Sequence, residues 1–287
     1  MTSKLSTKSF LAAAGLCALF TLPATAADYV FTAPPRDAGG DESDVYQPVA
    51  DYLSKVTGKR IVYQYADNWL TYQDKMRKGE YDIMFDGPHF LSWRIAKLQH
   101  EPLAKLPGKL VFATIAKKEN EKVNSMRDLA GRPVCGLAPP NLATLTLGAQ
   151  FDNPARQPLI LEVKSFKDAY DGVLSGKCLA ASLPVGALKK LDEQKQAVKV
   201  IYQSDGVPNQ GFSAGARFTA DERAKMAAAL LLPEAQTKMT KFFDTWNKGK
   251  DLAPANRGEY ENVVLLLKDT YGFDVTRVSA IDTKTGK

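Results

Sequence analysis

The stretch YDIMFDGPHFLSW, residues 81–93, joins a short apolar run to a helical pattern through a Gly-Pro turn. YDIMF has the length and the bulky apolar content of a buried strand, and Phe90–Leu98 has the spacing of a helix. In an α/β protein, ligands bind in the crevice outside the carboxyl ends of strands. The stretch therefore predicts a strand that ends at a binding site, with Asp86, His89 and Trp93 placed directly after it.

Strand and helix patterns alternate on both sides of this stretch. Before and including it, the expected strands cover 29–34, 60–66 and 81–85, with helices at 44–57 and 70–79. After a further strand at 110–118 and a short turn at 125–131, the expected strands cover 132–138, 159–166, 177–184 and 198–204, with helices at 141–151, 167–176 and 185–194. Asn141 is a candidate N-cap of the first of these helices. A strand at 212–218 then leads into helices at 219–232, 233–247 and 258–271. Two apolar stripes on the last two helices are expected to face the core: Met239, Phe242, Phe243 and Trp246, and then Tyr260, Val263, Val264, Leu267 and Tyr271. This order predicts two βαβαβ units, each with a parallel-stranded sheet covered by helices.

Two such units, joined by two crossing strands, predict an α/β clamshell with a cleft between the strand ends. We expect residues 27–112 and 218–287 to form the first lobe. The second lobe is expected to cover 113–217, including the two hinge crossovers. Closure of the hinge around a ligand is the expected motion.

Residues 1–26 predict a cleavable signal peptide and hence a periplasmic protein. Lys4 and Lys8 precede an apolar run, Phe10–Leu22, that is too short to span a bilayer, and Ala24-Thr25-Ala26 has the form of a cleavage site. Removal of two lysines and no acidic residue lowers the formal charge from +6 to +4. Basic and acidic residues are interspersed, which argues against a nucleic-acid partner.

Cys135 and Cys178 remain after the signal peptide is removed, and they predict a disulfide. In a lobe with strand order 2-1-3, they lie on the first and third strands, which are neighbours at a spacing of roughly 5 Å. A metal pair and a catalytic thiol are the alternatives. Asp86 and His89 are too few ligands for a metal site, and we expect neither a metal nor another cofactor.

Four segments resemble the phosphate/phosphite/phosphonate substrate-binding protein family of ABC importers. They include MRKGEYDIMFDGPHF (76–90) and VNSMRDLAGRPVCGLA (123–138), and the others begin at Tyr46 and at Val200. The resemblance implies the type II periplasmic binding protein fold, in which two α/β lobes hold one small solute without chemical catalysis. It also implies an ABC permease in the inner membrane as the partner of a protein that acts as a monomer.

The segments that carry the ligand in this family differ here. The family usually has a Ser/Thr-Ser-Gly turn after the first strand of the second lobe, where hydroxyl groups and helix amides hold an anion. This chain has GLAPPNLATL at 136–145, and Pro139 and Pro140 have no N–H to donate. An acidic residue that the family places after the third strand of that lobe is replaced by ASLPVGAL at 181–188. We therefore expect a ligand other than a standard phosphonate.

The expected ligand-binding residues follow the strand ends of both lobes: Arg36, Trp69, Tyr72, Asp86, His89, Asn141, Thr144, Ser182 and Asn209. Three of them have a structural alternative. Arg36 can pair with the acidic loop that follows it, Asp86 can cap the helix after the Gly-Pro turn, and His89 can be structural. Together with the prolines and Leu183 at the same strand ends, the expected cleft lining is aromatic and apolar with a few polar groups, which suits neutral or partly apolar ligands.

The sequence favours a periplasmic receptor that delivers a small solute to an ABC importer. One alternative is a periplasmic carrier of an apolar ligand of the lipid or sterol type, which the stretch NLATLTL at 141–147 favours. Another is an accessory protein that reports ligand occupancy to a membrane sensor. An enzyme is disfavoured, because the chain has no nucleophile elbow, P-loop or dinucleotide-binding motif.

Overall fold

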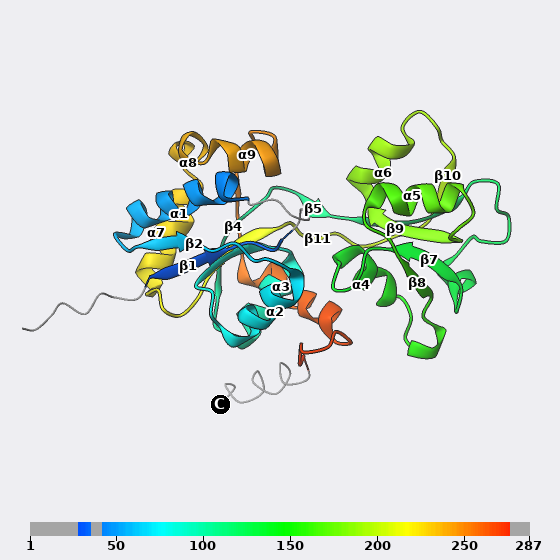
Figure 1. The fold of residues 1–287 in the computed structure, drawn as a ribbon, viewed down its shortest axis with the longest axis horizontal. Helices are drawn as coiled ribbons and strands as arrows, with labels where there is room; N and C mark the ends of the chain where they lie inside the picture. Colours follow the sequence, from blue (N-terminus) through cyan, green and yellow to red (C-terminus); the bar gives the residue numbers. More distant parts are fainter. Residues whose placement is uncertain (1–27, 36–41, 276–287) are drawn as a thin grey trace, which may run out of the picture.

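The structure is a computed structural model that describes residues 28–35 and 42–275. The expected signal peptide and Arg36 lie outside the described residues. Two lobes lie side by side, each built on its own β-sheet, with a thin connection between them (Figure 1).

The first lobe contains a six-stranded sheet in the order β13-β4-β12-β3-β1-β2. Its strands are β1 (Tyr29–Thr32), β2 (Ile61–Tyr63), β3 (Ile83–Asp86), β4 (Glu101–Lys105), β12 (Gly211–Ala214) and β13 (Ala253–Pro254). β1 pairs in parallel with β2 and β3, whereas β12, β4 and β13 add antiparallel strands. The sheet is therefore mixed rather than mostly parallel.

The second lobe contains a five-stranded sheet in the order β10-β6-β9-β7-β8. Its strands are β6 (Phe112–Lys117), β7 (Pro133–Gly136), β8 (Leu159–Glu162), β9 (Ala180–Pro184) and β10 (Val198–Gln203). β7 pairs in parallel with β8 and β9, and β6 and β10 are antiparallel additions. The arrangement β8-β7-β9 confirms the predicted 2-1-3 order.

The chain crosses between the lobes twice. The two crossing segments pair as short antiparallel strands, β5 (Lys109–Leu110) and β11 (Val207–Pro208), which lie between the lobes in Figure 1. Strand β12 follows the second crossing and belongs to the first sheet, although it falls inside the range expected for the second lobe, 113–217.

Helices cover both faces of each sheet. In the first lobe they are α1 (Ser43–Thr57), α2 (Trp69–Lys78), α3 (Pro88–Lys97), α7 (Ala220–Leu230), α8 (Pro233–Lys238), α9 (Thr240–Asn247), and the 3₁₀ helices η3 (Arg257–Tyr260) and η4 (Val263–Leu267). In the second lobe they are α4 (Leu142–Gly148), α5 (Phe166–Leu174), α6 (Val185–Asp192), and the 3₁₀ helices η1 (Met126–Leu129) and η2 (Pro154–Arg156). One apolar core of the first lobe packs α1, α7 and α9 against one face of its sheet, with Phe31, Phe85 and Phe242 fully buried.

The C-terminal helices differ from the prediction. The helix expected at 233–247 is interrupted at Met239, which has non-helical backbone angles between α8 and α9. The helix expected at 258–271 is two short 3₁₀ helices, and Tyr271, expected on its buried face, is 95% exposed. The helical spacing of this segment correctly placed Tyr260, Val264 and Leu267 in the interior, because a 3₁₀ turn also returns to one face every third residue.

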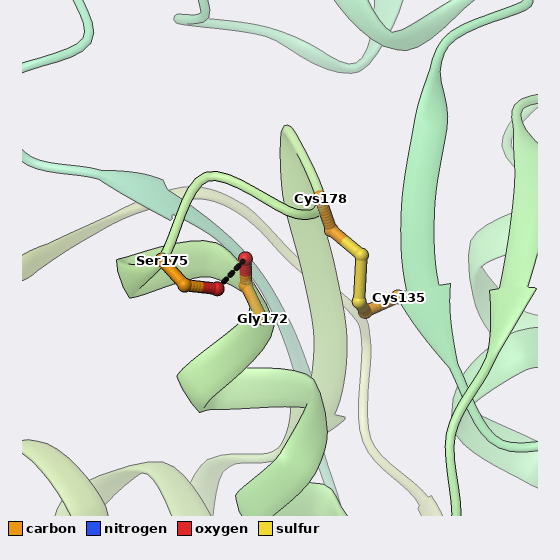
Figure 2. The surroundings of a disulfide bond; sticks show 4 residues. All are labelled: Cys135, Gly172, Ser175 and Cys178. Atoms are coloured by element: carbon orange, nitrogen blue, oxygen red, sulfur yellow. Dashed lines mark hydrogen bonds between the residues drawn. A yellow bond between two sulfur atoms is a disulfide. The ribbon is translucent and has the colours of Figure 1, made fainter.

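Cys135 on β7 and Cys178 just before β9 form the predicted disulfide (Figure 2). Their Cα atoms are 5.6 Å apart. Helix α5 packs against the bridge at Gly172, where an added Cβ would lie 2.7 Å from the Cys135 Sγ. A glycine is therefore required here for the close contact between α5 and the disulfide.

Candidate functional site

A cavity of about 550 Å³ lies between the two lobes. Pro34 follows β1, Gly87 follows β3 and Pro184 ends β9, and all three contribute to its wall. Leu110 and Gln210 contribute from the two crossing segments. The cavity therefore lies at strand ends of both sheets and beside the hinge, where a clamshell protein would hold its ligand.

The wall of this cavity is mainly apolar and aromatic. Five aromatic side chains line it, two of them on the second lobe's side: Trp69, Phe90, Phe112, Phe166 and Trp246. The polar side chains among the described wall residues are His89, Asn141, Lys164 and Gln210. None of the described wall residues is a serine, a threonine or an acidic residue.

Helix α3 begins at the cavity and holds His89 in its first turn. Gly87 is the N-cap and Pro88 is the first helical residue, a position where the missing N–H costs nothing. A Cβ on Gly87 would lie 2.7 Å from the Cε1 atom of His89. The Gly-Pro sequence therefore starts the helix and also leaves room for the imidazole ring to lie against the turn.

The imidazole of His89 is 5% exposed and has no hydrogen-bond partner on either nitrogen within the described residues. It packs against Phe90, with ring centroids 4.1 Å apart. Burial lowers its pKa to about 4, although the Asp86 carboxylate and the nearby Pro140 carbonyl favour the protonated form. Pro140 belongs to the opposite lobe and approaches the ring without the geometry of a hydrogen bond. At neutral pH the ring is therefore uncharged and lies at the junction of the lobes.

Asp86 is fully buried beneath the cavity and binds protein groups. It accepts hydrogen bonds from Arg94 Nη1 at 2.6 Å and Nη2 at 2.8 Å, and from the Tyr72 hydroxyl. The expected alternative, in which Asp86 caps α3, is wrong, because the α3 N-cap is Gly87 and no side chain caps it. Asp86 and Tyr72, both expected to bind ligand, are placed instead in an internal network that supports the β3–α3 turn.

Arg94 links this network to the antiparallel part of the sheet. Its guanidinium donates to the Ser213 hydroxyl on β12, with Nη2 2.9 Å from the oxygen. Ser213 Oγ lies 3.1 Å from His100 Nδ1. Since arginine only donates, the serine hydroxyl accepts from Arg94. Burial, followed by the charges of Arg94 and Arg223, holds the pKa of His100 well below its usual value.

The turn after β7 is stabilised by its own side chains. Asn141 is the N-cap of α4, as predicted, and its Oδ1 accepts from the Ala143 N–H at 3.0 Å. Thr144 donates to the Leu137 carbonyl at 2.6 Å, and Ser182 donates to the Ala143 carbonyl at 3.1 Å. Of these three expected ligand residues, only Asn141 lines the cavity between the lobes.

Thr144 lines a second cavity, of about 420 Å³, on the other side of the Pro139-Pro140 turn. Helix α2, helix α4 and the segment 265–271 enclose this cavity. Exposed Leu70 and Tyr271 lie at its wall.

Asn209 connects the two crossing segments. Its Nδ2 donates to the Pro107 carbonyl at 3.0 Å, and its Oδ1 accepts from the Gln210 N–H at 2.9 Å. The neighbouring Gln210, rather than Asn209, lines the cavity. Asn209 therefore lies in the hinge, next to the site.

Of the eight expected ligand residues that the structure describes, three line the cavity: Trp69, His89 and Asn141. Sequence reasoning missed Phe112, Phe166 and Lys164, and it assigned Trp246 to a core-facing stripe. Phe112 is the first residue of β6 and Phe166 is the first residue of α5, so a systematic inspection of element ends would have found them. Nothing in its own segment marks Trp246, because helix α9 reaches the cavity only through the packing of the first lobe.

Among residues 28–35 and 42–275, no cluster of three or more His, Cys, Asp or Glu side chains has an arrangement suited to a metal ion. No helix in this part of the chain has the length and apolarity to cross a membrane.

Two α/β lobes that are connected by paired crossing strands and enclose a cavity define a two-lobed solute-binding protein. Residues 31–260 match the family described as ABC transporter, phosphonate, periplasmic substrate-binding protein, and the chain belongs to this family. The protein is therefore a binding protein and not an enzyme. A comparison with curated protein sequences gave no match.

Solved structures share the fold at low sequence identity. XAC2383 from Xanthomonas citri bound to ATP is 13% identical, with a TM-score of 0.65, over 85% of this chain and 98% of that chain. PhnD1 from Prochlorococcus marinus in complex with methylphosphonate is 15% identical, with a TM-score of 0.61, over 84% and 97%. A binding protein component of an ABC phosphonate transporter from Pseudomonas aeruginosa, PA3383, is 14% identical, with a TM-score of 0.56, over 84% of both chains. These likenesses confirm the predicted fold class.

Proposed function

We propose that this protein, exported by a signal peptide at residues 1–26, captures a small organic solute between its lobes. It then delivers the solute to an ABC permease in the inner membrane. The observation that carries the proposal is the cavity of about 550 Å³ at the strand ends of both sheets. A volume in this range suits a small organic molecule. Capture would stabilise a closed arrangement, because one ligand then contacts both lobes.

The chemistry of the wall argues for a ligand other than a standard phosphonate. A phosphonate dianion needs several donors or a cation, since an unpaired buried charge is very unfavourable. The described wall contains no hydroxyl side chain, Pro139 and Pro140 have no N–H, and the Ala143 N–H is already bonded to Asn141. Lys164, the one cationic side chain of the described wall, is exposed.

A second candidate function is a periplasmic carrier of a larger apolar ligand. The five aromatic side chains of the wall favour this function, because such surfaces bind apolar molecules without specific charges. The two functions share the site and differ in what happens to the ligand after binding.

The proposal is tested on protein purified from the periplasm. Denaturing mass spectrometry of the purified protein identifies a co-purified molecule, and small-angle X-ray scattering with and without that molecule reports lobe closure. We expect one solute per chain and a decrease in the radius of gyration. Trp69→Ala should weaken binding at least tenfold, whereas Leu232→Ala, an exposed residue between α7 and α8, should not change it.

Binding without compaction, or equal binding by Trp69→Ala, would contradict capture between the lobes. Uptake of the identified molecule by cells with and without this protein then separates an importer from a carrier. If this protein is part of an importer, cells that lack it should fail to take up the molecule at low concentration.

A further inference from the structure

His89 is the most deeply buried polar side chain of the cavity wall, and its surroundings lead to an inference about the class of ligand. This inference rests on the proposed function. Both of its ring nitrogens lack a hydrogen-bond partner among the described residues, although the side chain is 95% buried. Leaving a buried polar group without a partner costs about 1–3 kcal/mol. Such a group at the wall of a binding cavity needs a partner that arrives with the ligand.

Whether a ligand can contact the imidazole of His89 depends on how far apart the two lobes are. The ring belongs to α3 of the first lobe, and the Pro140 carbonyl of the second lobe approaches it. The Pro139-Pro140 turn and His89 line the same cavity. Separation of the lobes moves Pro140 away from the ring, so a ligand that enters between the lobes can occupy the place next to the nitrogens.

Two other polar side chains of the wall, those of Asn141 and Lys164, are less suited to be this anchor. The Asn141 carboxamide oxygen is bonded to the Ala143 N–H at the start of α4. The Lys164 side chain is exposed, so its ammonium group keeps its hydration. His89 is held in place by Phe90 and by the turn at Gly87, so it offers a fixed hydrogen-bonding geometry.

The protonation of the ring decides which ligand group matches it. Asp86 and Arg94, the charged groups nearest the ring, are paired with each other, and Lys164 lies at the exposed part of the wall. A neutral imidazole has one N–H donor and one acceptor nitrogen. A hydroxyl or a carboxamide matches it, because each both donates and accepts. An ionised carboxylate or phosphonate only accepts, and its charge would have no buried counter-ion.

The rest of the wall favours a ring. Trp69, Phe90 and Phe112 line the cavity together with Phe166 and Trp246, and aromatic surfaces of this kind favour stacked or edge-to-face contacts. We propose that the ligand is an uncharged aromatic or alicyclic compound whose hydroxyl or carboxamide group hydrogen-bonds to the imidazole of His89, while its ring packs against the aromatic wall.

The test is calorimetric titration at pH 7 of ligand-free protein with three probes of equal ring size: 2-naphthol, 2-naphthoate and 2-naphthyl phosphate. We expect 2-naphthol to bind at least tenfold more tightly than either anion. His89→Phe keeps an aromatic ring but removes both nitrogens, and it should weaken 2-naphthol binding about tenfold. His89→Gln keeps a donor and an acceptor and should recover part of this loss. Lys190→Ala, which removes an exposed positive charge on α6 and is not among the described wall residues, is the control for charge and should leave 2-naphthol binding within twofold.

Three results would overturn the inference: an anionic probe that binds as tightly as 2-naphthol, equal 2-naphthol binding by folded His89→Phe, or no binding of 2-naphthol to the unmodified protein. Thermal unfolding of each variant shows whether it is folded, and His89→Gln keeps the test decisive if His89→Phe does not fold. The proposed function is judged separately, by lobe closure with the co-purified solute. A solute that closes the lobes but is anionic would leave the receptor function intact and refute the ligand class.

Discussion

Asp86 and Arg94 form an ion pair with both side chains fully buried. Removal of one partner of such a pair leaves an uncompensated charge in the interior, which typically costs 3–5 kcal/mol. We expect Arg94→Met to lower the free energy of unfolding by about that amount, measured by urea denaturation. Lys78→Met is the matched control, because Lys78 pairs with Asp74 at 2.8 Å on the exposed face of α2. Equal stability of Arg94→Met and the unmodified protein would show that the network does not support the fold.

His89 and His100 also predict how stability depends on pH. Their pKa values are lowered on folding, to about 4 for His89, so the unfolded chain binds more protons than the folded one between pH 4 and 6.5. Stability therefore falls as pH falls through this range. The His89 contribution amounts to about 3 kcal/mol over the whole range. Urea denaturation at several pH values measures the free energy of unfolding, which should decrease less on acidification for His89→Gln than for the unmodified protein. Identical decreases would contradict the lowered pKa of His89.

Local sequence patterns predicted side-chain hydrogen bonds only where the partner is close in the chain. Asn141 was predicted as an N-cap, and it bonds to a residue two positions away. The role of Asp86 was not predicted, because its partners are Arg94, on the far turns of α3, and Tyr72, on another helix. Both partners approach only after α2 and α3 have packed against the first sheet.

At the scale of elements, the disulfide joins β7 to the turn before β9, and neither cysteine is among the described residues of the cavity wall. It closes a segment with a sequence separation of 43 residues. For a loop of this length, the loss of chain entropy in the unfolded state corresponds to about 4 kcal/mol. We expect the paired substitution Cys135→Ala with Cys178→Ala to lower the melting temperature and leave ligand affinity within twofold. A large loss of affinity in a folded variant would mean that the bridge shapes the cavity.

Gly172 supplies an independent test of how α5 packs on the disulfide. An added Cβ would approach the Cys135 Sγ to 2.7 Å, so Gly172→Ala should destabilise the second lobe, and the melting temperature reports this. In the paired cysteine-to-alanine variant, where the sulfur is absent, the same change should have a much smaller effect. Additive effects of the two changes would contradict the proposed contact.

Among the elements of the first lobe, the periodic helix α1 was predicted well, whereas strand β4, which lacks a strand pattern, was missed. Helix α1 was expected at 44–57 and spans Ser43–Thr57, because its apolar face is regular and Gly58 ends it in a left-handed conformation. Strand β4, EPLAK, was missed, since it has no β-branched residue and contains Pro102. Pairing with β12 and β13 makes it a strand.

At the scale of the whole molecule, the paired crossing segments predict a hinge motion. Leu106 N–H donates to the Gln210 carbonyl at 2.8 Å, and β5 pairs with β11, so the two segments should bend as one unit. Asn209→Ala removes the side-chain bond to Pro107. We expect this variant to alter the closure of the lobes, seen by scattering with and without ligand, while each lobe keeps its fold. An unchanged scattering curve in both states would show that this bond does not control the hinge.

The sequence by itself determined the alternation of strands and helices, the two sheets, the disulfide and the family. The elements and the two sheets follow from short-range periodicity, and the family follows from motifs that are contiguous in the chain. The disulfide follows from the two remaining cysteines and the expected strand order. Only the tertiary structure decided which side chains meet in the cavity. Trp246 and His89 come from distant segments, and Asp86 pairs with Arg94 in the interior. The physical reason is that burial and partner choice depend on contacts between elements, which a local pattern of residues does not contain.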